Sequence, residues 1–221
     1  MSTPKICLDP GHGGSDPGAT GSVGLKEKNL VLDISLKLRD YLLGGWECEI
    51  KLTRKSDVFI PLIERSRIAN DWGADLFYSI HCNGHTNTDA NGWESFIYPS
   101  VSVRTEQIQR SIHRSVWKYL KTLHTFDRGL KRANFQVLRN TVMSAVLGEY
   151  LFVSGNIDRL LLKKPEAIDG MAKATAQGIA GALNLKKKAE NKTAILGELQ
   201  ATAAQMKKWA KRKNVHQRFN R

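Results

Sequence analysis

The chain has 221 residues, 41% of them hydrophobic and 25% charged, a balance typical of one globular domain with a sizeable core. No apolar run approaches the ~20 residues of a membrane-spanning helix, so the sequence predicts no transmembrane segment. The formal net charge is +13, and residues 186–221 alone, with 11 Lys and Arg against 2 Asp and Glu, carry +9 of it. Such a basic segment attracts polyanions in general and does not distinguish nucleic acid from other anionic polymers or lipid.

Hydrophobic periodicity divides residues 5–183 into strands and helices. In chain order, the patterns predict a strand over 5–9, a helix over 27–43, a strand over 48–53, a helix over 61–72, strands over 75–80 and 93–98, a helix over 101–123, short strands over 135–138 and 145–148, and a helix over 165–183. Because strands alternate with helices, we expect an α/β fold: a single three-layer domain with a mainly parallel sheet flanked by helices.

The N-terminus and the cysteines indicate the cellular compartment. The apolar stretch before Asp9 is too short for the hydrophobic part of a signal peptide, so we expect synthesis in the cytoplasm without one. Cys7, Cys48 and Cys82 form no C-x-x-C motif and cannot all pair within one chain. We therefore expect buried or unreactive thiols in a reducing compartment.

Four polar residues stand where predicted strands end or a helix begins. His12 and His81 follow strands, Glu149 ends another apolar segment, and Glu27 begins the first helix. In open α/β sheets, ligands bind beyond the carboxyl ends of strands, so one cleft can collect all four. Two His and one carboxylate suit a catalytic zinc ion, and a second carboxylate suits proton transfer. Spacing alone leaves structural roles equally open, such as a Glu that interacts with the helix dipole.

Sequence motifs in the same regions resemble those of one enzyme family. They read LDPGHGG at residues 8–14, GLKEKNL at 24–30, SIHCN at 79–83, RGLK at 128–131 and AVLGE at 145–149. In this order, over residues 6–183, they resemble the zinc-dependent N-acetylmuramoyl-L-alanine amidases of the amidase-3 type, which form the catalytic domains of phage endolysins and autolysins. Several linked motifs in register are far more specific than one Gly-rich loop.

The resemblance implies a function and a role for each of the four polar residues. The expected enzyme is a zinc hydrolase that cleaves the amide bond between N-acetylmuramic acid and L-alanine in peptidoglycan and so lyses the cell wall. The resemblance implies one Zn²⁺ ion per chain, held by His12, Glu27 and His81, and it implies that Glu149 is the catalytic carboxylate. These roles agree with those that the residue types suggest.

Other residues near the motifs are weaker candidates. Arg128 and Arg139 are candidate substrate-binding residues, because either can bind a carboxylate of the stem peptide, although an Arg that covers a sheet is the commoner case. His85 lies four residues after His81 in a loop, which lacks the helical geometry of an H-x-x-x-H metal motif. The chain departs from the family at Gly148, where a β-branched residue is usual.

The chain divides into a predicted zinc amidase catalytic domain, residues 1–185, and a basic linker with a helical tail, residues 186–221. A short helix is predicted over 200–213, and one such helix cannot bury a core by itself. Residues 194–206 resemble a segment that precedes a glucosaminidase-like module in some wall-lytic proteins. We interpret the tail as the start of a truncated second module, or as a remnant reused to bind anionic wall polymers.

Two alternative functions remain open at this point. One is a zinc exopeptidase on free peptides, which shares the metal chemistry; the other is a non-catalytic module that binds cell wall or nucleic acid, suggested by the charge of +13. The complete set of two His and two Glu favours an enzyme. We therefore expect peptidoglycan as the partner, no specific nucleic acid, and action at the cell wall after release from the cytoplasm.

Overall fold

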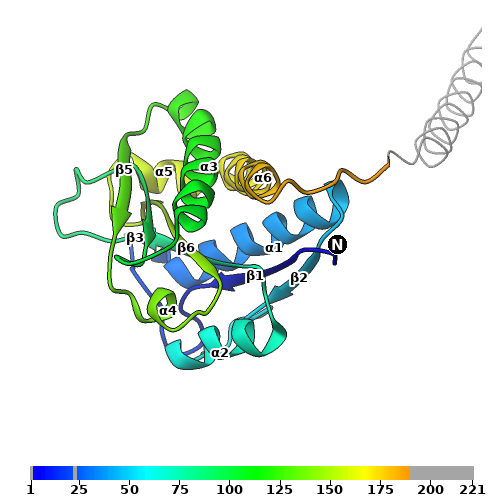
Figure 1. Cartoon of the computed structure of the whole chain (residues 1–221). Helices are drawn as coiled ribbons and strands as arrows, with labels where there is room; N and C mark the ends of the chain where they lie inside the picture. Colours follow the sequence, from blue (N-terminus) through cyan, green and yellow to red (C-terminus); the bar gives the residue numbers. More distant parts are fainter. Residues whose placement is uncertain (1, 22–23, 190–221) are drawn as a thin grey trace, which may run out of the picture. The chain divides into compact units, whose positions relative to one another are not determined.

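The computed structural model describes residues 2–21 and 24–189, and residues 1–187 form one compact unit (Figure 1). Its helices and strands, in chain order, are β1 (Lys5–Pro10), α1 (Glu27–Gly45), β2 (Glu49–Leu52), α2 (Leu62–Trp72), β3 (Leu76–Asn83), β4 (Trp93–Ile97), α3 (Val103–Leu120), the 3₁₀ turn η2 (Lys121–Leu123), β5 (Asp127–Arg132), α4 (Gln136–Arg139), β6 (Ser144–Phe152), α5 (Asp158–Leu162) and α6 (Pro165–Ala182).

The strands form one six-stranded sheet in the order β2-β1-β3-β6-β4-β5. Strands β2, β1, β3 and β6 are parallel, whereas β4 pairs antiparallel with β6 and parallel with β5. The carboxyl ends of β1, β3 and β6 therefore meet the amino ends of β4 and β5 at one edge of the sheet. The predicted α/β architecture with a mainly parallel sheet is confirmed.

Helices cover both faces of the sheet, which gives the three layers. Helices α1, α3 and α6 pack together on one face, and α2 and α4 contact each other on the opposite face (Figure 1). Helix α1 buries Leu30, Ile34, Leu38 and Leu42, which recur at helical spacing and so form one apolar stripe. The Ala and Gly of α6 let it approach α3 closely: a Cβ at Gly178 would lie 2.7 Å from the Cα of Ile112.

Two predictions of secondary structure are wrong. The segment 135–138, predicted as a strand, lies mostly in the short helix α4, which buries the adjacent residues Val137 and Leu138. Periodicity cannot separate a strand from a helical turn in so short an apolar run. The sequence also gave no sign of β5 (Asp127–Arg132), because this edge strand is polar and largely exposed, without the apolar alternation of a half-buried strand.

The two residues that follow the predicted catalytic domain pair with the segment before β2. The backbone N–H of Glu47 donates to the carbonyl of Lys186 at 2.8 Å, and Lys187 forms a β-bridge with Trp46. The predicted helix at 200–213 lies outside the described residues, so the second module stays a prediction. No helix within residues 2–21 and 24–189 combines the length and hydrophobicity that crossing a membrane requires.

Candidate metal and catalytic site

The loop after β1 carries His12, and a buried ion pair holds that loop in place. His12 has a left-handed backbone with φ of 57°. The guanidinium of Arg65 donates to the carbonyl of His12 at 2.6 Å and to a carboxylate oxygen of Asp9 at 2.9 Å. Both Arg65 and Asp9 are buried, so each needs the other as a partner. The pair fixes the path of the chain from β1 into the loop.

Glu27 occupies the centre of the site at the start of α1. Its side chain is buried, and Oε2 accepts a hydrogen bond from the N–H of Ala19 at 2.7 Å. Oε1 lies 3.1 Å from Nε2 of His12 and 3.0 Å from Nδ1 of His81. Burial tends to raise the pKa of Glu27, but hydrogen bonds with the two histidines outweigh it, so the pKa lies well below its usual value and the group is a carboxylate.

The donor set of this cluster fits a zinc ion. One ligand atom each from His12, Glu27 and His81 lies within 4.8 Å of the others, and no other such group of His, Cys, Asp or Glu occurs among the described residues. Nδ1 of His12 lies 2.8 Å from a carboxylate oxygen of Asp16, an arrangement that orients a ligating imidazole and leaves Nε2 for the metal. Two His and one carboxylate are a ligand set of catalytic zinc sites.

Two glycines of the loop are required by the close approach of the ligands. A Cβ at Gly11 would lie 2.2 Å from Cε1 of His81, and one at Gly18 would lie 2.6 Å from Oε2 of Glu27. Gly18 also has a positive φ of 65°, which side chains rarely adopt. These positions thus exclude any larger residue, which explains why the loop is rich in glycine.

Glu149 lies beside the histidine cluster, on the next strand of the sheet. It pairs in register with His81 across β3 and β6. Its Oε2 atom is buried and has no hydrogen-bond partner among the described residues. Burial, followed by the charges of Glu27 and Glu94, raises the pKa of Glu149 well above its usual value. A carboxyl group in this state is suited to exchange a proton with a molecule bound at the cluster.

Comparison with known proteins assigns this site to a family. The family model described as N-acetylmuramoyl-L-alanine amidase matches residues 6–181. The chain belongs to the N-acetylmuramoyl-L-alanine amidase family. It is thus a peptidoglycan amidase, which cleaves the bond between N-acetylmuramic acid and L-alanine, and the alternative of a non-catalytic binding module is excluded.

Individual relatives agree with this assignment. A sporulation-specific N-acetylmuramoyl-L-alanine amidase of Bacillus subtilis is 46% identical over 184 residues, which cover 83% of this chain and 69% of the relative. The endolysin of Bacillus phage SPP1 is 45% identical over 185 residues, covering 83% and 67%. The crystal structure of an N-acetylmuramoyl-L-alanine amidase from Clostridium difficile 630 superposes with a TM-score of 0.79 at 28% identity, covering 83% of this chain and 98% of that one.

Packing explains the glycine at position 148 of the amidase. A Cβ at this position would lie 2.4 Å from the hydroxyl of Tyr78 and 2.8 Å from Cη2 of Trp93. Trp93 is fully buried, and its ring lies 4.7 Å from that of Tyr150. The three aromatic side chains therefore fill the space into which a β-branched residue would point. The departure reflects the core beneath the strand and leaves the carboxylate of Glu149 on the opposite face.

The weaker candidates from the sequence, Arg128, Arg139 and His85, lie outside the group of three metal-binding side chains. Arg128 lies at the start of β5, and its Nε donates to Glu94 at 2.8 Å. Arg139 is exposed on α4 and donates to the side chain of Asn134 at 2.5 Å. His85 is exposed, and its Nδ1 accepts a hydrogen bond from the N–H of Asn87 at 2.9 Å, away from the group of three ligand atoms. All three cysteines are buried and form no disulfide.

Sequence reasoning missed two kinds of residue around the site. Asp16 stands next to the first motif, but its role in orienting His12 depends on how the loop folds back. Glu94 and Lys131 form an ion pair near Glu149, and no sequence signal connected them, because they lie on separate strands.

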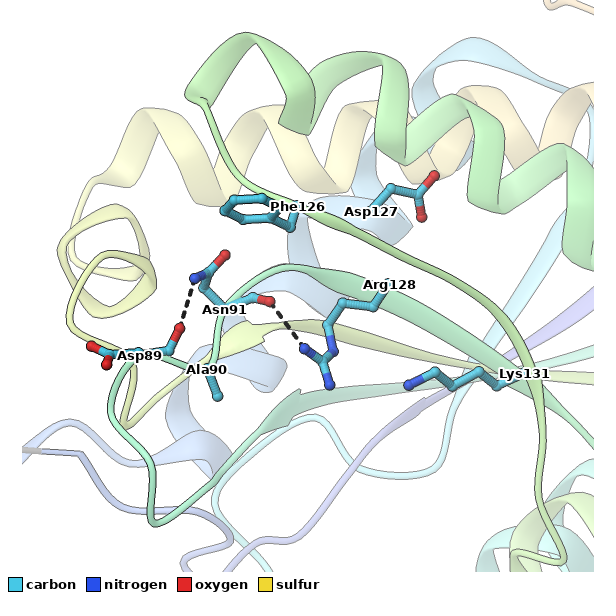
Figure 2. Close-up of a pocket in the computed structure, with 7 residues that line it drawn as sticks. All are labelled: Asp89, Ala90, Asn91, Phe126, Asp127, Arg128 and Lys131. Carbon is cyan, nitrogen blue, oxygen red and sulfur yellow. Dashed lines mark hydrogen bonds between the residues drawn. The ribbon is translucent and has the colours of Figure 1, made fainter.

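Two hollows flank the site along the edge of the sheet. The first, of about 320 Å³, lies on the β1 side and is lined by His12 and His81 together with the apolar residues Phe59, Ile60, Leu62 and Val137. The second, of about 450 Å³, lies on the β4 and β5 side, between the loop before β4 and the start of β5 (Figure 2). Charged residues, among them Arg128 and Lys131, line the second hollow together with Phe126 and Ala90.

Proposed function

We propose that this amidase cleaves its substrate with one zinc ion held by His12, Glu27 and His81, and with Glu149 as the acid–base group. The observation that carries the proposal is the position of the unpartnered Oε2 of Glu149, on the strand next to three convergent metal-binding atoms. A zinc ion bound there would polarise the scissile carbonyl and acidify a water molecule.

The protein groups divide the remaining work. The carboxylate of Glu149 takes a proton from the attacking water and then delivers it to the nitrogen of L-alanine, so that the peptide leaves as an amine. Asp16 keeps the imidazole of His12 in one tautomer and orientation. The Arg65–Asp9 ion pair keeps the loop in place, so the ligands need no reorganisation when substrate binds.

The experiment that tests the proposal combines metal analysis with digestion of peptidoglycan. The purified full chain should contain one zinc per molecule, and a chelator should abolish the release of peptides, which added zinc should restore. Mass spectrometry should find products with a free N-terminal alanine and an intact lactyl carboxylate. Full activity after the metal is shown to be absent would contradict the zinc assignment, and products cut within the peptide would indicate a peptidase.

A second proposal concerns the basic tail, residues 186–221, and its action at the wall. Its net charge of +9 favours binding to anionic wall polymers. It should contribute little to the chemical step, because charges in water act over only ~8 Å at physiological salt. Removing residues 188–221 should weaken binding to intact walls, with a difference that shrinks as salt rises. Equal wall binding by both forms at low salt would contradict this role.

The truncation should leave the turnover of a small soluble muropeptide nearly unchanged. It begins after Lys187, because Lys186 and Lys187 pair with the segment that precedes β2. The side chain of Arg139 is exposed and contacts Asn134. Its substrate-binding role stays a prediction.

A further inference from the structure

A row of side chains continues from the metal ligands across the sheet. His81 pairs in register with Glu149, and Glu149 pairs with Glu94 on the opposite side. Residues in register on neighbouring strands point to the same face and lie about 5 Å apart. Glu94 is therefore about two strand spacings from His81, on the side of the sheet where β4 and β5 lie.

Glu94 is a buried carboxylate that holds two cations in place. Its Oε2 accepts from Nε of Arg128 at 2.8 Å and forms an ion pair with Nζ of Lys131, and its Oε1 accepts from Nδ2 of Asn83 at 2.9 Å. These hydrogen bonds oppose the effect of burial and keep the pKa of Glu94 below its usual value. One negative charge faces two positive charges, which leaves a surplus of one positive charge at this point.

The two cations remain available to a ligand. The side chains of Arg128 and Lys131 are 36% and 37% exposed, respectively. Each is braced by an aromatic ring: the guanidinium of Arg128 lies 4.9 Å from the ring centre of Phe152, and Nζ of Lys131 lies 5.8 Å from that of Phe96. In Figure 2 their charged ends point towards each other across the wall of the second hollow. Both charged ends already contact Oε2 of Glu94, and Nη1 of Arg128 lies 3.4 Å from the carbonyl oxygen of Asn91. The exposed N–H groups that remain on the two cations suit a second carboxylate.

The acidic residues of the hollow do not neutralise this site. Asp127 points away from the two cations (Figure 2), and its Oδ1 accepts hydrogen bonds from the backbone of Gly129 and pairs with His113. Asp89 lies on the loop before β4, on the other side of Arg128 from Lys131 (Figure 2). The surplus positive charge is therefore carried by the exposed parts of Arg128 and Lys131, on either side of the Glu94 carboxylate.

The first hollow offers no comparable group. Its cation is Arg65, which is buried and donates to Asp9 and to three backbone carbonyls. The remaining walls include Phe59, Ile60 and Leu62, which are apolar. An anionic part of the substrate is thus directed to the β4 and β5 side of the site.

We propose that Arg128 and Lys131, positioned by Glu94, bind the free α-carboxylate of the residue that follows L-alanine in the stem peptide. In peptidoglycan this residue is a glutamate joined through its side chain, so its α-carboxyl group is either free or amidated. L-alanine separates that group from the scissile bond. This spacing matches the distance of about two strand spacings between His81 and Glu94. The subsite makes the amidase selective for the free acid, and it rests on the proposed function.

The test compares two soluble N-acetylmuramoyl peptides that differ only in this group, one with the free α-carboxylate and one with the α-carboxamide. The wild-type zinc enzyme should cleave the free acid with a kcat/KM about 10–100 times higher, the usual effect of a charge-assisted hydrogen bond. The variant Lys131→Met, which keeps the stem over Phe96, should reduce this ratio about tenfold or more. A loss of rate common to both substrates cancels in this ratio, so the ratio is the readout.

A neighbouring residue on the same strand supplies the control. Arg132→Met removes a cation that pairs with Glu106 instead, and it should keep the wild-type ratio. Equal cleavage of both substrates by the wild type, or an equal loss on both in Lys131→Met, would overturn the subsite while the amidase mechanism stands. Failure of the wild type to cleave either substrate would overturn the mechanism together with the subsite.

Discussion

The two sides of the active site are built in different ways. On the proposed metal side, His12 comes from the loop after β1, Glu27 from the start of α1 and His81 from β3. On the peptide side, Glu94, Arg128 and Lys131 come from β4 and β5, which run in the opposite direction. Glu149 on β6 lies between the two sides and pairs with both.

This difference shows how each side is specified. The positions of the proposed metal ligands depend on short local structures: a glycine-rich loop, the first residue of a helix and the end of a buried strand. The residues of the peptide side depend on strand register, because Glu94 meets Lys131 only when β4 and β5 pair as they do. Zinc binding should therefore be sensitive to added side-chain atoms at the loop glycines, and substrate selectivity to changes of charge on the peptide side. Three substitutions examine the residue between the two sides, the metal side and the core beneath them, and the Lys131→Met variant examines the peptide side.

The largest effect is expected where the two sides meet. Glu149→Gln removes the proton acceptor but leaves the three ligands, so zinc content and fold should be retained while kcat falls by about 10²–10⁴. Metal analysis and steady-state kinetics on a soluble muropeptide measure the two quantities. Loss of zinc from this variant would make Glu149 a ligand and would place it on the metal side.

An intermediate effect is expected from Gly11→Ala. Its Cβ would lie 2.2 Å from the ring of His81, so the ligand must move and zinc affinity should fall by about 10–100-fold, as when the support of a ligand is lost. Competition with a chelator measures this affinity. The matched control is Gly44→Ala near the end of α1, where a Cβ meets nothing within 4 Å and alanine favours the helix. Equal zinc affinity in both variants would contradict the tight approach at Gly11.

The smallest effect on catalysis is expected from Gly148→Val, which restores the β-branched residue usual in the family. The new side chain meets Tyr78 and Trp93, so the free energy of unfolding should fall by about 1–3 kcal/mol, while the folded enzyme keeps its zinc. Denaturant unfolding measures the loss. Adding Trp93→Phe removes the Trp93 atoms in this contact but leaves the Tyr78 hydroxyl, so it should recover part of the loss. Strictly additive effects would show that Trp93 is not the obstacle.

The sequence by itself determined the α/β class, most of the helices and which four polar residues lie together at the centre of the candidate site. It could do so because buried strands, amphipathic helices and tight glycine turns each leave a local pattern of residue types. His12 after the first strand and Glu27 at the start of the first helix are visible in such patterns. The motifs then connected these residues to one family, which the comparisons confirmed.

Only the tertiary structure decided the side of the site that faces the peptide. The edge strand β5 is polar and leaves no apolar pattern, and the segment 135–138 is too short for periodicity to show that it is helical. The reversal of β4 against β6 is a matter of chain topology, and it alone places Glu94 beside Glu149. Contacts between distant residues depend on register and packing, and these are properties of the assembled sheet that no local sequence pattern contains.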